Sequence, residues 1–129
     1  MSMTFPSDLR YTPDHEWLRP QGARCRVGVT QFAVDQLGDI TLVDLPKEGE
    51  QVTKGQRFGT VESVKSVSDL YAPVSGKVVA VNGQLKDSPE DVNSDPYGKG
   101  WMIEIEPNDK TELDELLAAD AYSKHVAAQ

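Results

Sequence analysis

The 129-residue sequence contains one cysteine, two histidines and no long hydrophobic run. The lone Cys25 excludes an internal disulfide and any all-cysteine metal site. His15 and His125 have no metal-ligand spacing to other ligand residues, so a zinc or di-iron site is not expected. The longest aliphatic runs, such as Val78–Val81, are far shorter than the roughly 20 residues that a membrane span needs. We therefore expect neither a membrane protein nor a metalloprotein.

Targeting signals are also missing from the sequence. Met1–Arg10 has no apolar stretch of signal-peptide length and carries Asp8, and it is not an Arg-rich presequence. We expect a cytoplasmic bacterial protein. A mitochondrial protein from which the presequence had been removed would have the same features.

The sequence lacks the motifs of a self-sufficient enzyme. It has no G-x-S-x-G, no G-x-G-x-x-G and no phosphate-binding loop of the Walker form. We interpret His15 as a locally hydrogen-bonded residue, His125 as a solvated residue of a frayed C-terminus and Cys25 as a core residue. Lys and Arg total 13 against 21 Asp and Glu, and the net charge of -8 disfavours nucleic-acid binding. The same charge favours attraction to basic partner surfaces.

The composition predicts a single domain over residues 1–129, with a core over about 11–106 and a C-terminal helical segment over about 109–125. Residues 25–29 alternate as in a half-buried strand, and Thr30 is expected to cap a helix over 31–37 that ends at Gly38. The alternation of Thr41, Val43 and Leu45 predicts another strand.

The last third of the chain is predicted to be a loop, a strand and a helix. Asp87–Gly100 contains two prolines and two glycines and is expected to be a loop. Trp101–Glu106 alternates as a strand. Asp109 with Glu112 has the spacing of a capping box, and apolar residues at 113, 116, 117 and 121 indicate one helical face.

A pattern P-x-x-G-x-x-V occurs twice, at Pro46–Val52 and Pro73–Val79, and each copy predicts a turn followed by a strand. Between the copies, strands are predicted over 58–64 and 67–71. Only Lys65 and Ser66 separate them, which predicts a hairpin with a two-residue loop and a type I turn. Lys65 would then stand at the tip of the hairpin and point into water.

The setting of Lys65 suits a lysine that another enzyme must reach and acylate. Glu62 precedes it by three residues, and small serines at 63, 66 and 68 keep the tip uncluttered. The ammonium is expected to be protonated in water, so a modifying enzyme would have to supply the deprotonation. The alternative interpretation is an ordinary surface lysine that contributes only to solubility.

The stretch Val61–Asp69, with Lys65 at its centre, resembles the lipoylation site of the glycine cleavage H-protein family. The resemblance extends from about Tyr11 to Tyr122. It is also carried by Tyr11–Trp17, Val27–Thr30, Leu37–Ile40, Leu45–Pro46, Pro73–Gly76, Asn93–Gly98 and Gly100–Trp101. Two related families differ at this position. Biotinyl domains usually have methionines beside the lysine, and lipoyl domains of 2-oxo acid dehydrogenases typically read Asp-Lys-Ala there, whereas this sequence has valine and serine beside Lys65.

The resemblance implies a mostly β fold, a β-sandwich of the barrel-sandwich hybrid (lipoyl/biotinyl-like) type with short flanking helices and a C-terminal helix. It implies a carrier that is not an enzyme, with one lipoic acid in amide linkage on Lys65. The carrier would take the aminomethyl group of glycine from the pyridoxal-phosphate-dependent glycine decarboxylase to the tetrahydrofolate-dependent aminomethyltransferase. Dihydrolipoamide dehydrogenase would reoxidise it, and a lipoylating enzyme would be a fourth partner. We expect a monomer that binds neither nucleic acid nor membrane.

The resemblance also implies roles for four other residues. Glu16 and Asp69 are candidate contacts for the loaded arm, and the alternative is two solvated surface carboxylates. Glu62 and Gly76 are candidate recognition features for the lipoylating enzyme, and the alternatives are a strand surface charge and a turn glycine. Where some members have histidine this sequence has Gln36, which cannot titrate.

Two other functions are compatible with the residues. A lipoyl-relay protein that donates its lipoyl group to other apoproteins would also need Lys65, so the sequence does not separate it from the carrier. The other alternative is an unmodified interaction domain or a small enzyme.

Overall fold

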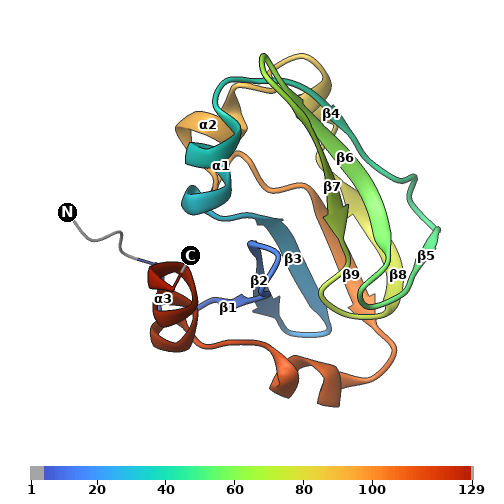
Figure 1. Cartoon of the computed structure of the whole chain (residues 1–129). Coiled ribbons are helices and arrows are strands. Elements are labelled where there is room, and N and C mark those ends of the chain that lie inside the picture. The colour runs from blue at the N-terminus through green and yellow to red at the C-terminus, as the bar shows by residue number, and fades with distance from the viewer. Residues whose placement is uncertain (1–4, 129) are drawn as a thin grey trace.

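The computed structural model describes residues 5–128 and consists of two antiparallel sheets with short helices beside them (Figure 1). The six-stranded sheet has the order β1 (Arg10–Tyr11), β2 (Glu16–Gln21), β3 (Arg24–Val29), β9 (Ile103–Pro107), β8 (Gly76–Val81) and β5 (Gln51–Val52). The three-stranded sheet has the order β4 (Ile40–Asp44), β6 (Arg57–Ser63) and β7 (Val67–Tyr71). The helices are α1 (Gln31–Leu37), α2 (Asp91–Ser94) and α3 (Ala119–Ala127), with 3-10 turns over Gly83–Lys86 and Lys110–Glu115. In this part of the chain no helix is long and apolar enough to cross a membrane.

The main core is built from apolar side chains of both sheets. Val27 of β3, Val61 of β6 and Val78 of β8 belong to one buried cluster. The strand predicted for residues 25–29 is confirmed, and its apolar residues Cys25, Val27 and Val29 are buried as expected. Burial of such side chains is the main favourable term in folding, so this cluster joins the two sheets.

Helix α1 begins and ends where the sequence predicts. The hydroxyl of Thr30 accepts a hydrogen bond from the N–H of Ala33 at 3.3 Å. Gly38 has a φ of 81° and donates its N–H to the carbonyl of Val34 at 3.0 Å. A glycine adopts this left-handed conformation without strain, so it ends the helix and turns the chain into β4.

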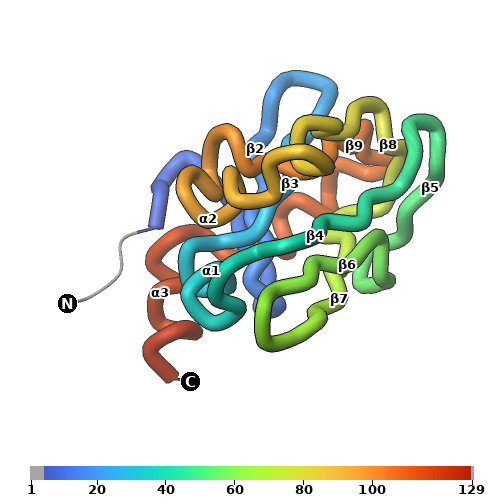
Figure 2. The backbone as a smooth tube through the Cα atoms, turned by 90° about the horizontal axis from the view of Figure 1, so that it is seen from above, coloured from blue at the N-terminus to red at the C-terminus, as the bar shows by residue number. Residues whose placement is uncertain are grey.

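The two P-x-x-G-x-x-V copies meet in space. The strands that follow them, β5 and β8, pair with each other, with Gln51 opposite Lys77 and Val52 opposite Gly76. The N–H of Gly49 also donates to the carbonyl of Val78 at 2.7 Å. Figure 2 shows β5 on the far side of the molecule from α1.

A second cluster of buried aromatic side chains holds α3 against β1 and β2. The rings of Tyr11 and Tyr122 stack with a centroid distance of 4.6 Å and an interplanar angle of 7°. The hydroxyl of Tyr122 lies 2.7 Å from Nδ1 of His15. His125 is half-buried and its Nε2 lies 3.0 Å from the carbonyl oxygen of Pro13, so the prediction of a solvated, frayed residue was wrong.

The C-terminal segment differs from the continuous helix expected from residue 109. A 3-10 turn over Lys110–Glu115 is followed by extended chain at Leu117, which bridges to Tyr11, and only then by α3. Asp109 does cap the turn by accepting from the N–H of Thr111 at 2.9 Å. The carboxylate of Glu112 accepts instead from the N–H of Ser75 at 2.8 Å, so the capping box does not form.

Two further expectations need correction. The predicted loop over 87–100 contains the helix α2, whose Val92 is fully buried. The sequence predicted that Thr41 and Val43 would face the same side of a strand. In β4 a register shift between Ile40 and Leu42 leaves Thr41 exposed, and only Val43 of these two is buried. A bulge of this kind turns side chains to the other face of a sheet.

The close contact of Trp17 with Gly28 yields a test of the fold. A Cβ on Gly28 would lie 2.7 Å from indole atoms of the fully buried Trp17, whereas a Cβ on Gly83 would meet nothing within 4 Å. We expect Gly28→Ala to lower the free energy of unfolding by about 1–3 kcal/mol through overpacking. Gly83→Ala should change it by less than about 0.5 kcal/mol. Urea unfolding measures both, and equal effects of the two substitutions would contradict the contact.

Candidate functional site

Lys65 lies at the exposed tip of the β6–β7 hairpin. The N–H of Ser63 donates to the carbonyl of Ser66 at 2.8 Å, which closes the turn. The hydroxyl oxygen of Ser63 accepts from the N–H of Lys65 at 3.3 Å and from that of Ser66 at 3.1 Å. The central residues of the turn are therefore Val64 and Lys65, one position earlier than predicted. Neither has a positive φ, in agreement with the unprimed turn expected from the sequence.

The tip of the hairpin rests on the end of α1. The N–H of Val64 donates to the carbonyl of Asp39 at 3.1 Å. Cε of Lys65 lies 3.4 Å from the position that a Cβ on Gly38 would occupy. Because Gly38 has no side chain, the aliphatic part of Lys65 can lie over this end of the helix.

Exposed apolar side chains lie at and beside the hairpin. Val64 is 71% exposed, Val67 is 65% exposed and Leu42 is 47% exposed. Glu62 pairs with Leu42 on β4 and with Val67 on β7, so these three side chains form one row across the sheet. Lys65 thus emerges beside an exposed apolar patch that contains one carboxylate.

Glu16 has a buried carboxyl group, contrary to the alternative of a solvated surface residue. Its side chain is 2% exposed. Oε1 accepts from the hydroxyl of Thr12 at 2.7 Å, and Oε2 accepts from the N–H of Tyr71 at 3.3 Å. Burial raises the pKa of Glu16 to about 8 despite these two hydrogen bonds. The carboxyl group therefore holds a proton at neutral pH when no cation is near it.

A pocket of about 280 Å³ opens beside Glu16. Its walls include Asp14 from the turn before β2, Tyr71 from the end of β7 and Leu116. Lys54 and Glu115 form an ion pair at the same pocket and join the β5–β6 connection to the C-terminal segment.

Asp69 lies on β7, two residues before Tyr71. Its carboxylate is 47% exposed and lies 4.0 Å from Nη1 of Arg57. The hydrogen bonds of Glu16 do not include Asp69, so the structure does not bring the two carboxylates into contact. They are related through β7, which carries Asp69 and supplies the N–H that Glu16 binds.

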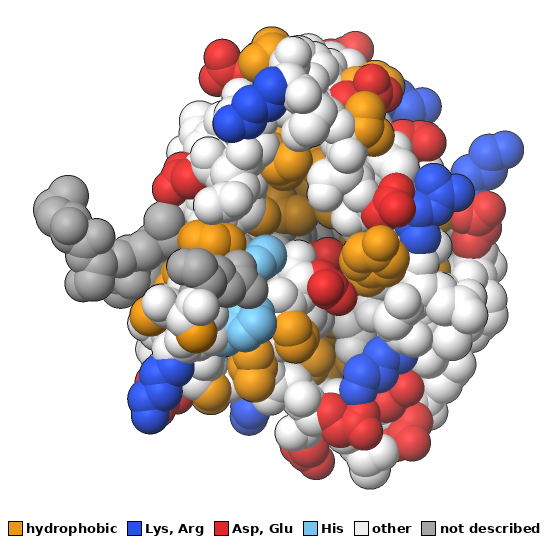
Figure 3. All heavy atoms as spheres, in the orientation of Figure 1, with side chains coloured by type: hydrophobic (Ala, Val, Ile, Leu, Met, Phe, Trp, Pro, Cys, Tyr) orange, Lys and Arg blue, Asp and Glu red, His pale blue; other side chains and the backbone are white. Residues whose placement is uncertain are grey.

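A hollow lies on the face of the molecule that α1 and β7 border (Figure 3). Figure 3 shows the face of the molecule seen in Figure 1 hollowed between α1 and β7, with hydrophobic side chains at its floor. Histidine and acidic side chains lie below the hollow in this view.

Glu62 and Gly76 lie in different parts of the fold. Glu62 is on β6, three residues from Lys65. Gly76 is buried at the start of β8, between Val52 and Pro107, and a Cβ there would lie 2.2 Å from the carbonyl oxygen of Glu106. The structure therefore explains Gly76 by close packing of β8 on β9 and does not bring it to the hairpin tip.

Some features of the site were not found from the sequence. Thr12 and the main-chain N–H of Tyr71 hold the Glu16 carboxyl, and Gly38 makes room for Lys65. Thr12 belongs to the Tyr11–Trp17 motif, which could have indicated it, but a main-chain donor leaves no signal in a sequence. Gln36 is exposed on α1.

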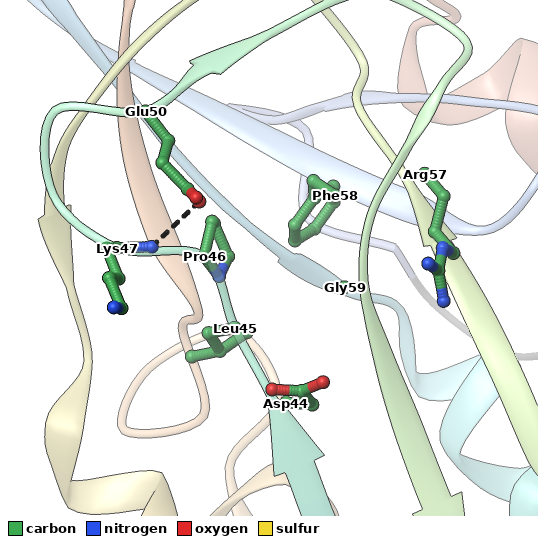
Figure 4. A pocket seen from close by; sticks show the side chains of 8 residues that line it. All are labelled: Asp44, Leu45, Pro46, Lys47, Glu50, Arg57, Phe58 and Gly59. Atoms are coloured by element: carbon green, nitrogen blue, oxygen red, sulfur yellow. Dashed lines mark hydrogen bonds between the residues drawn. The ribbon is translucent and has the colours of Figure 1, made fainter.

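Other pockets are lined by different residues. One of about 250 Å³ is lined by residues at the ends of β4 and β6, including Asp44, Lys47, Arg57 and Phe58 (Figure 4). It contains none of the predicted site residues. Among residues 5–128, no group of three or more His, Cys, Asp or Glu side chains could hold a metal ion.

The buried carboxyl group of Glu16 predicts a pH dependence of stability. Between the ordinary pKa of 4.5 and about 8, the folded chain binds a proton at Glu16 that the unfolded chain does not. The free energy of unfolding should therefore fall as the pH rises through this range, by at most about 1.4 kcal/mol per pH unit. Glu16→Gln, which mimics the protonated form, should lose this slope in urea unfolding between pH 5 and 8. Glu48→Gln, a change at an exposed carboxylate, should keep it. Parallel curves for Glu16→Gln and the unchanged protein would contradict the burial.

Comparison with known proteins identifies the family. The family model for "Glycine cleavage H-protein" matches residues 9–129. A probable glycine cleavage system H protein of Haloarcula marismortui is 54% identical over 126 residues, 98% of this chain and 99% of the relative. The glycine cleavage system H protein of Anoxybacillus flavithermus is 55% identical over 124 residues, 96% of this chain and 98% of the relative.

A solved structure gives the same result for the fold. The crystal structure of a glycine cleavage system H protein from Mycobacterium marinum is 43% identical and superposes with a TM-score of 0.87. The match covers 95% of this chain and 99% of that one. It confirms the barrel-sandwich hybrid fold. The chain belongs to the glycine cleavage H-protein family, whose members are lipoyl carriers of the glycine cleavage system and not catalysts.

Proposed function

We propose that this chain carries one lipoic acid, joined through an amide to Nζ of Lys65, and presents it to the enzymes of the glycine cleavage system. The observation that supports the proposal is the exposed Lys65 side chain on a turn fixed by Ser63. The residues fit the group, because the amine is accessible and forms no ion pair among the residues that the structure describes. Acylation of Lys65 would therefore break no ion pair of the fold.

A bound lipoyl group supplies a dithiolane that can take up an aminomethyl group together with electrons. The expected partners are the glycine decarboxylase, the aminomethyltransferase, dihydrolipoamide dehydrogenase and a lipoylating enzyme. Each of them must reach Lys65, and the hairpin presents this residue at its exposed tip. The net charge of -8 favours transient, salt-sensitive encounters with basic surfaces of these partners.

The tether itself contributes to the function. Amide formation removes the charge of Lys65 and leaves a long flexible side chain. A short flexible link of this kind holds its reactive end at an effective concentration of roughly millimolar for a docked partner. The carrier therefore needs only weak docking to deliver its group.

Glu16 and Asp69 are the proposed acidic contacts for the cationic end of a loaded arm. The carboxyl group of Glu16 is buried, and a nearby ammonium would favour its ionised form and so offset part of the cost of burial. Asp69 is on the strand whose Tyr71 N–H binds Glu16, so both carboxyl groups border the same strand. Burial makes Glu16 the stronger electrostatic partner of the two, because exposed pairs contribute little.

Glu62 is the proposed recognition contact for the lipoylating enzyme, since it lies in the exposed row beside Lys65. Gly76 would act through the fold, by letting β8 pack closely on β9. An enzyme that docks on the hairpin would meet the carboxylate of Glu62 together with Val67 and Leu42.

Replacement of Lys65 tests the attachment site. We expect Lys65→Arg to fold with a free energy of unfolding within about 0.5 kcal/mol of the unchanged protein, because the side chain is exposed. Intact mass after expression with lipoate and a competent ligase should show no lipoyl group on this variant. Reconstituted glycine decarboxylation should be absent. Lys77→Arg, an exposed lysine on β8, should remain fully modified. A lipoyl group mapped by peptide mass to any other lysine would overturn the proposal.

Glu62 provides a separate test of recognition. We expect Glu62→Gln to slow lipoylation of Lys65 by about tenfold at low salt, because a carboxylate at the docking rim is lost. The measurement is the initial rate of lipoyl transfer by a purified ligase. Glu48→Gln removes the same charge at an exposed position outside the hairpin and should leave the rate unchanged. Equal rates for both variants and the unchanged protein would remove Glu62 from the recognition surface.

A further inference from the structure

The side-chain amide of Asn93 bonds the main chain on both sides of Asp39. Asn93 belongs to α2, which lies against α1 (Figure 1). Its Nδ2 donates to the carbonyl of Gly38 at 2.9 Å, and its Oδ1 accepts from the N–H of Ile40 at 2.9 Å. One side chain thus binds the two peptide groups that flank Asp39 and form the turn from α1 into β4.

The second of these peptide groups also holds the tip of the β6–β7 hairpin. It joins Asp39 to Ile40, and its carbonyl oxygen accepts from the N–H of Val64 at 3.1 Å. A trans peptide points its N–H and its C=O to opposite sides. Because Asn93 binds the N–H of this peptide, its carbonyl is turned away from α2 and toward Val64. Hydrogen bonds in such a chain polarise one another, so the bond to Asn93 strengthens the bond that supports the tip.

The turn depends on a side chain for its orientation because Gly38 precedes it. Gly38 has a φ of 81° and a ψ of -153°. A residue without a Cβ adopts many backbone conformations at similar cost, so the main chain after Gly38 has no strong orientation of its own. Without Asn93, rotation of the peptide groups beside Asp39 would take the acceptor away from the N–H of Val64.

The segment that follows Asn93 is tied to the core and to the start of α1. The carbonyl of Pro96 accepts from Nε1 of the fully buried Trp17 at 2.9 Å. The hydroxyl of Tyr97 accepts from the N–H of Gln31, the first residue of α1, at 2.9 Å. Residues 93–97 therefore hold α1 at both ends, and the turn after α1 is fixed relative to the core.

We propose that Asn93 is a positioning residue for Lys65, because its amide holds the Asp39 carbonyl that supports the hairpin tip. The proposal rests on the proposed acylation of Lys65 and adds to it a residue that is distant in the sequence. An enzyme that binds only the supported tip loses apparent affinity in proportion to the fraction of chains whose tip is unsupported. Loss of the Asn93 amide therefore raises the KM of the lipoylating enzyme for this chain. It leaves kcat unchanged, because a bound tip is held by the enzyme itself.

Amide hydrogen exchange of the unmodified, ¹⁵N-labelled chain tests the support. We expect the Val64 N–H to exchange at least about tenfold faster in Asn93→Ala than in the unchanged protein. The N–H of Ser63, which closes the turn within the hairpin, should keep its rate. Equal Val64 rates in the two proteins would overturn the proposal. So would a Val64 N–H that exchanges in the unchanged protein as fast as in an unstructured peptide, and this measurement needs no variant.

Asn82 provides a matched control. Its side-chain Nδ2 also donates to two main-chain carbonyls, those of Lys99 and Trp101, each at 2.8 Å. Neither carbonyl belongs to the hairpin or to the turn after α1. Asn82→Ala therefore removes a comparable clamp, and the Val64 exchange rate should stay within about twofold of the unchanged protein. An equal rise of this rate in Asn82→Ala and Asn93→Ala would indicate a general loss of stability and would overturn the role of Asn93.

Initial rates of lipoyl transfer by a purified ligase provide the functional readout. In Asn93→Ala the KM for the chain should rise at least about fivefold with kcat unchanged, whereas Asn82→Ala should keep both values. Near-ultraviolet circular dichroism checks that each variant is folded at the assay temperature. A fall in kcat at an unchanged KM would contradict a positioning role.

The outcomes also separate this inference from the function on which it rests. Mass spectrometry that finds no lipoyl group on Lys65 of the unchanged chain would overturn both. A lipoylated Lys65 with the same KM in Asn93→Ala and in the unchanged chain would overturn the positioning role alone and leave the carrier function intact.

Discussion

The hydrogen bond from the N–H of Val64 to the carbonyl of Asp39 is the contact on which the presentation of Lys65 depends. It joins the tip of the three-stranded sheet to the turn after α1, which is itself fixed by the left-handed Gly38. A hairpin alone is only marginally stable in water, so its tip needs support from another element. Because the support comes from a main-chain carbonyl beside a glycine, it leaves the Lys65 side chain accessible.

Electrostatics divides the site into an exposed part and a buried part. At the tip, Glu62 and Lys65 are accessible to partners and contribute little to the stability of the fold. Glu16 is different, because its carboxyl group has been removed from water and is held by Thr12 and Tyr71. A buried acid of this kind is costly to ionise without a cation, and such arrangements are typical of functional sites. The candidate site thus combines accessible charges at the tip with a carboxyl group that is shielded from water.

The sequence was sufficient where a local signal decides the structure. Thr30 and Gly38 bound α1 as predicted, and the alternation around Val27 marked a buried strand. The hairpin that carries Lys65 was also predicted, although its turn begins one residue earlier than expected. Prediction failed where a residue distant in the sequence replaces a local hydrogen-bond partner. The carboxylate of Glu112, for example, binds the N–H of Ser75 instead of completing a capping box with Asp109. Burial of Glu16 depends on how the two sheets meet, and no local pattern encodes that.

The pairing of β3 with β9 has a consequence for biosynthesis. Cys25 lies opposite Ile105, and Tyr11 bridges to Leu117, so the first quarter of the chain completes its sheet only with the last. Folds dominated by such distant pairings form late and slowly compared with folds built from neighbouring segments. The β6–β7 hairpin is local, but the six-stranded sheet against which it packs is complete only after β9 has been synthesised. A ligase that recognises the complete sheet would therefore act only on chains in which β9 has already been made.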